Sequence, residues 1–262
     1  MKLTLKSPET AMLAVCTLLL LIALLGPSVG QPANYHQFAD QHTWFGIPFA
    51  MDVLTNLPFA VWGIIGLLRL RELPRHRLDA SQRGTAKLFF AGLVLTAICS
   101  GWYHWEPRDA GLAVDRLGMV VAFAGLLGLA AASRISARCG TALALVVVVL
   151  GPMSVATWAL TANVLPWAVL QFGGMAVVLC LARLPRLAGA LPVQWGSVIL
   201  IYAAAKLLEQ GDHHVYQLLG YTLSGHSLKH LVASMAAWPV LSALHACTEP
   251  AGVMQPAASR IG

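Results

Sequence analysis

Five polar side chains in this sequence have the types and the spacing of a metal site. His226 and His230 are four residues apart, and so are Ser100 and His104, so on helices each pair would share one face. Asp115 follows the first pair closely. All five stand at or near the end of an apolar segment, where imidazoles and a carboxylate are costly unless they satisfy one another or bind something. We interpret the three histidines as the ligands of one zinc ion.

A zinc held by three histidines is typical of a catalytic site. Such sites leave the fourth position to water, and zinc lowers the pKa of that water from about 15.7 to about 7. Asp115 would then orient the water or carry its proton, and Ser100 would donate a hydrogen bond to the substrate oxygen that gains negative charge. The set predicts hydrolysis at neutral pH.

Each of these residues also has a simpler interpretation. A single histidine at a helix end can reach water or cap a carbonyl. Ser100 can bond back to a carbonyl of its own helix, and Asp115 can stand at a helix start and pair with Arg116. The metal interpretation therefore depends on the three imidazoles meeting in space.

The elements that must position these residues are membrane-spanning helices. The chain is 58% hydrophobic and only 11% charged, which a soluble core of this length cannot accommodate. Crossing a bilayer takes about 20 helical residues, and strands are not expected because the apolar segments lack the alternation of a barrel. The fold class is thus an all-α integral membrane protein, a seven-transmembrane helix bundle with an additional N-terminal apolar segment. We expect spans at Ala11–Gly26, Pro48–Leu70, Leu88–His104, Leu112–Ser133, Thr141–Leu160, Val164–Leu181, Val193–Leu208 and His226–His245.

The N-terminal segment, residues 1–30, has two possible roles. It begins with Lys2 and Lys6, continues through a leucine-rich stretch and ends with small residues at Ser28 and Gly30, which suits cleavage of a signal peptide. An uncleaved extra transmembrane helix explains the same pattern. Both alternatives place the chain after residue 30 on the non-cytoplasmic side.

Lysine and arginine predict the orientation of the bundle. Cytoplasmic loops are enriched in these residues, and the basic residues here gather around 69–87, 134–138 and 183–186, in every second connection. Residues 31–247 then form the membrane domain, residues 248–262 a cytoplasmic tail, and the histidines face the non-cytoplasmic side. The net charge of +6 is explained by this topology and needs no nucleic acid as a partner.

Three short motifs resemble a known family. Ser100-Gly-Trp-Tyr-His104, Asp115-Arg-Leu-Gly-Met119 and Gly225-His-Ser-Leu-Lys-His230 are similar to the motifs of the alkaline ceramidases, within the CREST superfamily of seven-helix membrane hydrolases. The resemblance covers about residues 35–245. It implies a zinc held by His104, His226 and His230, with Ser100 and Asp115 assisting cleavage of the amide bond of a sphingolipid such as ceramide and release of a fatty acid.

The same resemblance bears on the surroundings of the site. The stretch Asp52-Val-Leu-Thr-Asn56 looks like the family's first core helix, with Thr55 where serine is frequent, so Asp52 and Asn56 are candidates to brace the site. Gly118 departs from the family pattern, which often has proline there. Eukaryotic alkaline ceramidases also bind calcium through an acidic cluster before the first core helix, of which only Asp40 and Asp52 stand in this chain, so calcium is a doubtful cofactor.

Two further expectations concern partners and the competing function. His213 and His214 form either a polar rim near the substrate or a solvated stretch. The expected partners are the bilayer and a membrane lipid substrate, ceramide or another N-acyl lipid, and no obligate protein partner is evident. The alternative function is a receptor-like or metal-transporting protein that uses the same histidines, although transport sites usually lie near the midplane of the membrane.

Overall fold

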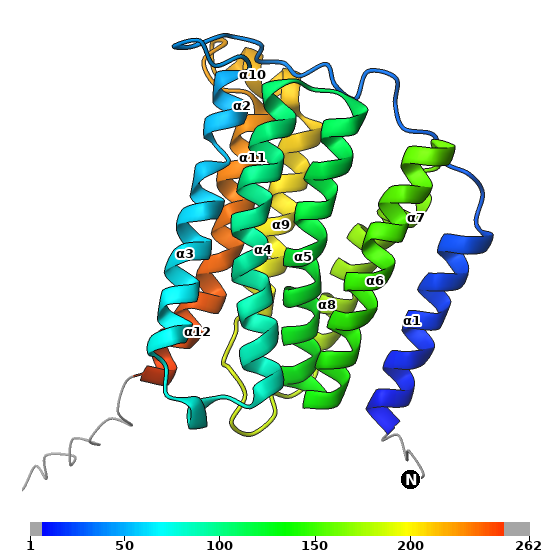
Figure 1. Cartoon of the computed structure of the whole chain (residues 1–262), viewed down its shortest axis with the longest axis vertical. Helices are drawn as coiled ribbons and strands as arrows, with labels where there is room; N and C mark the ends of the chain where they lie inside the picture. Colours follow the sequence, from blue (N-terminus) through cyan, green and yellow to red (C-terminus); the bar gives the residue numbers. More distant parts are fainter. Residues whose placement is uncertain (1–6, 249–262) are drawn as a thin grey trace, which may run out of the picture.

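A computed structural model describes residues 7–248 of the chain as an assembly of helices (Figure 1). No strand is formed within this described range, where only two isolated β-bridges occur. The α-helices are α1 (Ser7–Leu25), α2 (Ala50–Leu54), α3 (Leu57–Glu72), α4 (Ala80–Trp105), α5 (Asp109–Arg134), α6 (Ala137–Thr161), α7 (Leu165–Ala168), α8 (Gly174–Ala182), α9 (Trp195–Gln210), α10 (Asp212–Leu218), α11 (Gly225–Ser234) and α12 (Trp238–Thr248). Short turns add the 3₁₀ segments η1 (Arg75–Arg77) and η3 (Met235–Ala237) and the π turn η2 (Val169–Gly173).

All eight predicted apolar segments are helical, and seven are long and apolar enough to cross a membrane. The seven include α1. Three of them combine consecutive elements into one span, namely α2 with α3, α7 with α8, and α11 with α12. The remaining segment, α9, has 16 residues, which gives about 24 Å of helix against a bilayer core of about 30 Å. Within the described residues, six helices of the bundle and α1 thus have the length and hydropathy of a membrane span, one fewer than the seven plus an N-terminal extra that the sequence predicts.

Two helix boundaries differ from the sequence prediction. α4 begins at Ala80 rather than near Leu88, because the Asp79 side chain caps it by accepting a hydrogen bond from the Gln82 N–H at 2.8 Å. The stretch between α9 and α11, expected to be a loop, contains the short helix α10. Both differences arise from polar residues, which hydropathy alone assigns to loops.

Close backbone contact between α4 and α5 fixes the centre of the bundle. A Cβ added at Gly125 would lie 2.1 Å from the backbone nitrogen of Phe89, and one added at Gly92 would lie 2.2 Å from that of Ala122. Glycine at both positions lets the two helix backbones touch, as small residues do in packed apolar helices. These contacts join the first half of α4 to the second half of α5, so the two helices pack as a close antiparallel pair.

The basic connections lie together at one end of the bundle. The chain segments that follow α3, α5 and α8 are at the bottom of Figure 1, whereas α4 ends and α11 begins at the top. We call the latter the site end. The predicted basic loops and the predicted histidine site are thus at opposite ends of the molecule.

The N-terminal helix α1 lies at the edge of the bundle, against α7 and η2 (Figure 1). Glu9 is its one buried residue, and the carboxylate of Glu9 accepts a hydrogen bond from the Ser136 hydroxyl at 2.6 Å and pairs with Arg138, both near the start of α6. Lys2, Lys6 and residues 249–262 of the predicted tail lie outside the described range.

Candidate metal centre

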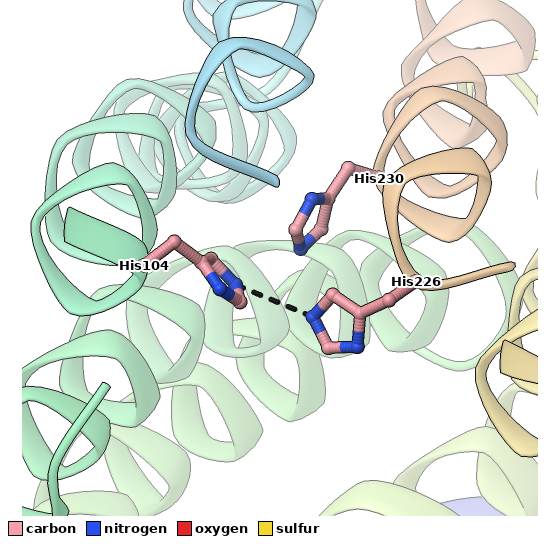
Figure 2. Close-up of side chains that lie close together, drawn as sticks. All are labelled: His104, His226 and His230. Carbon is pink, nitrogen blue, oxygen red and sulfur yellow. Dashed lines mark hydrogen bonds between the residues drawn. The ribbon is translucent and has the colours of Figure 1, made fainter. Parts of the chain in front are cut away.

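The three predicted ligands meet at the site end of the bundle. His104 comes from the last turn of α4, and His226 and His230 come from successive turns of α11 (Figure 2). One ring nitrogen from each histidine lies within 4.8 Å of the others, so the group could hold a metal ion. The central geometric prediction, that imidazoles from two distant stretches of chain converge, is confirmed.

The closest pair of nitrogens already has the spacing of two ligands on one ion. Nε2 of His104 lies 3.3 Å from Nε2 of His226. Ligands placed tetrahedrally at about 2.0–2.1 Å from an ion are about 3.3–3.4 Å apart. The other nitrogens of the set lie within 4.8 Å, so they need to close by no more than about 1.5 Å to share an ion at that distance.

A hydrogen bond to Thr55 sets the tautomer of His230. The Thr55 hydroxyl donates its single proton to the Met51 carbonyl oxygen at 2.6 Å, so its oxygen must accept from Nδ1 of His230, 3.1 Å away. Nδ1 therefore carries the proton, and Nε2 keeps its lone pair for a metal. Ligating histidines are commonly held by such a partner on the other ring nitrogen.

An aromatic side chain closes one face of the histidine group. The ring of Phe38, from the segment between α1 and α2, lies 4.8 Å from the ring of His104 and 4.3 Å from that of His226, measured between centroids. The three histidines are 1%, 7% and 4% exposed in chain order. This face is dry, which strengthens any electrostatic interaction within the group.

The start of α11 is anchored by two carboxylates. Asp212 accepts a hydrogen bond from the His226 backbone N–H at 2.7 Å and another from the Ala39 N–H at 2.9 Å. Asp52, fully buried, accepts from the Ser227 hydroxyl at 2.6 Å. Negative charge at a helix N-terminus is also favourable to the helix dipole. These contacts fix where His226 and His230 point.

Ser100 and Asp115 line a cavity that begins at His230. The cavity has a volume of about 90 Å³, and Asn56 also lines it. Both predicted assisting residues are buried, at 3% for Ser100 and 9% for Asp115. Oδ1 of Asp115 is buried and has no hydrogen-bond partner within the described protein, so its capacity to accept a hydrogen bond is unused. The structure thus brings the predicted assisting pair to the same side of the histidine group.

The rest of the cavity wall is charged, which the sequence reasoning missed. Arg116, Lys206, Glu209 and Lys229 all line it. The signal was present, because Lys206 and Lys229 stand inside predicted apolar spans, where ionisable residues are rare and mark sites. The sequence suggested Arg116 only as a partner for Asp115 at a helix start. Instead it is 2% exposed and donates to the Gln31 side chain at 2.7 Å.

The other predicted surroundings lie in different places. Asn56 donates to the Asp52 carbonyl oxygen at 2.8 Å and reaches the cavity. His213 and His214 have exposed side chains on α10 and do not line the cavity. Asp40 accepts hydrogen bonds from the backbone N–H of His42 at 3.0 Å and from Tyr216 at 3.3 Å. Asp40 and Asp52 are thus engaged in separate networks.

A comparison with protein-family models and one with curated proteins find no match for this chain. The function therefore has to be argued from the site itself.

Proposed function

We propose that this protein is a zinc-dependent membrane hydrolase that cleaves the amide bond of a lipid such as ceramide and releases a fatty acid. The observation that carries the proposal is the position of Ser100 and Asp115. They lie in one cavity with a ligand histidine, so a metal, a proton acceptor and a hydroxyl donor can reach the same atoms.

The donor set fits zinc. Three imidazoles, with the fourth position left to water, are a usual ligand set of catalytic zinc. His104, His226 and His230 would hold the ion. When bound, zinc activates a water molecule for attack and polarises a carbonyl oxygen.

The protein's own residues then move the proton and hold the substrate. Asp115, through its free Oδ1, accepts a proton from the attacking water and returns it to the amine nitrogen as the carbon–nitrogen bond breaks. The Ser100 hydroxyl donates to the carbonyl oxygen while that oxygen gains negative charge. The Phe38 ring keeps bulk water away from the opposite face.

The arrangement of charge supports membrane insertion with the site on the non-cytoplasmic side. The basic connections after α3, α5 and α8 lie at the end opposite the histidines, as expected for a cytoplasmic face. An amide at headgroup depth would then meet the site while its acyl chain stays among lipids. The likeness of three motifs to the alkaline ceramidases agrees with this proposal.

The test combines metal content with product release. Purified protein is assayed for bound zinc and for fatty-acid release from ceramide and other N-acyl lipids. We expect wild type to hold one zinc and release acid, His226→Ala to lose both, and Asp115→Asn to keep zinc while its rate falls about 10²–10⁴-fold. His214→Ala, on an exposed histidine, is the matched control and should change neither.

A transporter or receptor gives a different result. Zinc would be bound, no lipid would release acid, and in the transporter case the ion would cross proteoliposomes. That outcome would refute the hydrolase proposal while leaving the metal site in place.

A further inference from the structure

The cavity next to the histidines carries more positive than negative charge. Three cationic side chains line it, Arg116, Lys206 and Lys229, against the two carboxylates Asp115 and Glu209. A metal ion bound by the neutral histidines would add to this excess. Charge buried among apolar helices is costly unless an opposite charge meets it, so the cavity favours an anion.

The carboxylate of Glu209 is already shared between two lysines. It accepts from Lys206 Nζ at 2.5 Å and from Lys229 Nζ at 2.6 Å, and the three side chains are only about a fifth exposed. One carboxylate balances one of the two ammonium groups. A positive charge therefore remains in this part of the wall.

Arg116 presents unused donors on the same cavity. Its guanidinium lies over the Trp158 ring at 4.1 Å from the centroid, and its Nη2 donates to Gln31. Its Nε and Nη1 are buried and have no hydrogen-bond partner within the described protein. A guanidinium with unused donors, held over an aromatic ring, suits charge-assisted hydrogen bonding to a carboxylate or a phosphate.

A π turn also contributes to the lining of the cavity. η2 interrupts the helix between α7 and α8, and Gln171 within it is 8% exposed and lines the cavity. Single π turns occur often at functional sites, because the extra residue redirects a side chain. Here the cavity gains a polar amide side chain in its lining.

The size and polarity of the cavity exclude a long acyl chain as its occupant. About 90 Å³ gives room for a small polar group. An alkyl chain placed there would strip water from charged groups and offer them no hydrogen bond. The headgroup side of a substrate fits the cavity, and the acyl side does not.

We propose that this cavity is a subsite for an anionic headgroup, so that the preferred substrates are N-acyl lipids whose amine part carries a carboxylate or a phosphate. The inference rests on the proposed hydrolase function, because it places the scissile amide at the histidines and the headgroup against Arg116 and Lys206.

Equilibrium binding tests the subsite without requiring hydrolysis. The probes are N-dodecylsulfonylglycine, which has no cleavable amide, and its neutral glycinamide counterpart, applied to the zinc-loaded protein in nanodiscs. We expect the acid to bind about tenfold to a hundredfold more tightly than the neutral probe, since it gains charge-assisted hydrogen bonds. Arg116→Gln and Lys206→Met should each reduce this preference by at least about fivefold. Arg108→Gln, on a largely exposed arginine paired with Glu106, is the matched control and should keep it.

Lys206→Met is a second variant in case Arg116→Gln does not fold. It should fold, because Glu209 keeps Lys229 as an ion-pair partner. Equal binding of acid and neutral probe would overturn the subsite, and so would a preference that survives both variants. Dodecanoate is a third probe, whose carboxylate would reach the histidines rather than Arg116. If Arg116→Gln weakens dodecanoate as much as the glycine probe, the cavity binds the released fatty acid and the headgroup assignment is wrong. Hydrolysis of ceramide by a protein without this preference would leave the proposed function standing.

Discussion

Replacing Thr55 with valine should weaken zinc binding although Thr55 would not touch the metal. Valine keeps the shape of threonine and removes the hydroxyl that accepts from Nδ1 of His230 at 3.1 Å. The site is closed, since Thr55 is 6% exposed and His230 4%, so water does not easily replace the lost acceptor. A buried donor left without a partner costs about 1–3 kcal/mol. That corresponds to a loss of about 5-fold to 150-fold in zinc affinity, in line with the 10–100-fold typical when the partner of a ligating histidine is removed.

Competition with a chelator of known affinity measures this loss directly. Thr55→Ser is the control, because serine restores the hydroxyl in the break between α2 and α3, and its affinity should stay within about threefold of wild type. Thermal unfolding of the metal-free proteins separates a local effect from a general loss of structure. Valine and serine variants with equal affinities would refute the assigned tautomer, and so would a valine variant that binds zinc as tightly as wild type.

Two further predictions concern the scaffold. Gly125→Leu should destabilise the protein by about 3 kcal/mol or more, because a Cβ there lies 2.1 Å from the Phe89 backbone nitrogen. Chemical denaturation measures this loss, with Gly84→Leu as the control, since Gly84 is exposed on α4 and no atom lies within 4 Å of its added Cβ. Similar losses of stability in both variants would contradict the close-contact argument. Glu209→Gln should lower the free energy of unfolding by about 1–3 kcal/mol in the same assay, since it leaves Lys206 and Lys229 without the carboxylate that both contact. The double variant with Lys206→Met should recover part of this loss. A double variant as unstable as Glu209→Gln would show that repulsion between the two lysines is not the cause.

The features of this structure that can be predicted from the sequence are those set by the spacing of neighbouring residues along the chain. Hydropathy places the helices because apolar length is a property of consecutive residues. The pairs Ser100 with His104 and His226 with His230 share helix faces because four residues make about one turn. Even the meeting of two distant stretches follows from counting spans, since both pairs must stand at the same end of an up-and-down bundle.

The parts that escaped prediction depend on how helices pack sideways. Nothing local says that Thr55 faces His230, because that contact requires α2 to lie beside α11. The sequence suggested Arg116 only as a partner for Asp115, whereas the packing of α5 and α6 places it over Trp158. The π turn that directs Gln171 into the cavity leaves no clear mark in composition.

Under the proposed function, the two faces of the histidine group would allow one small site both to hold a metal and to select a lipid. Phe38 covers His104 and His226 on one face. The hydrogen bond from the His226 backbone N–H to Asp212 holds the start of α11 in place on that side. On the other face, the cavity begins at His230 and presents Ser100, Asp115 and then the basic wall. Under the proposed function, a carbonyl would approach a bound metal from this second face, so the groups that would move the proton and those that would bind the headgroup lie along one cavity. A substrate amide bound there would have its amine part directed into the cavity and its acyl part directed out of it. On this proposal the protein would select lipids by their headgroup rather than by their chain length.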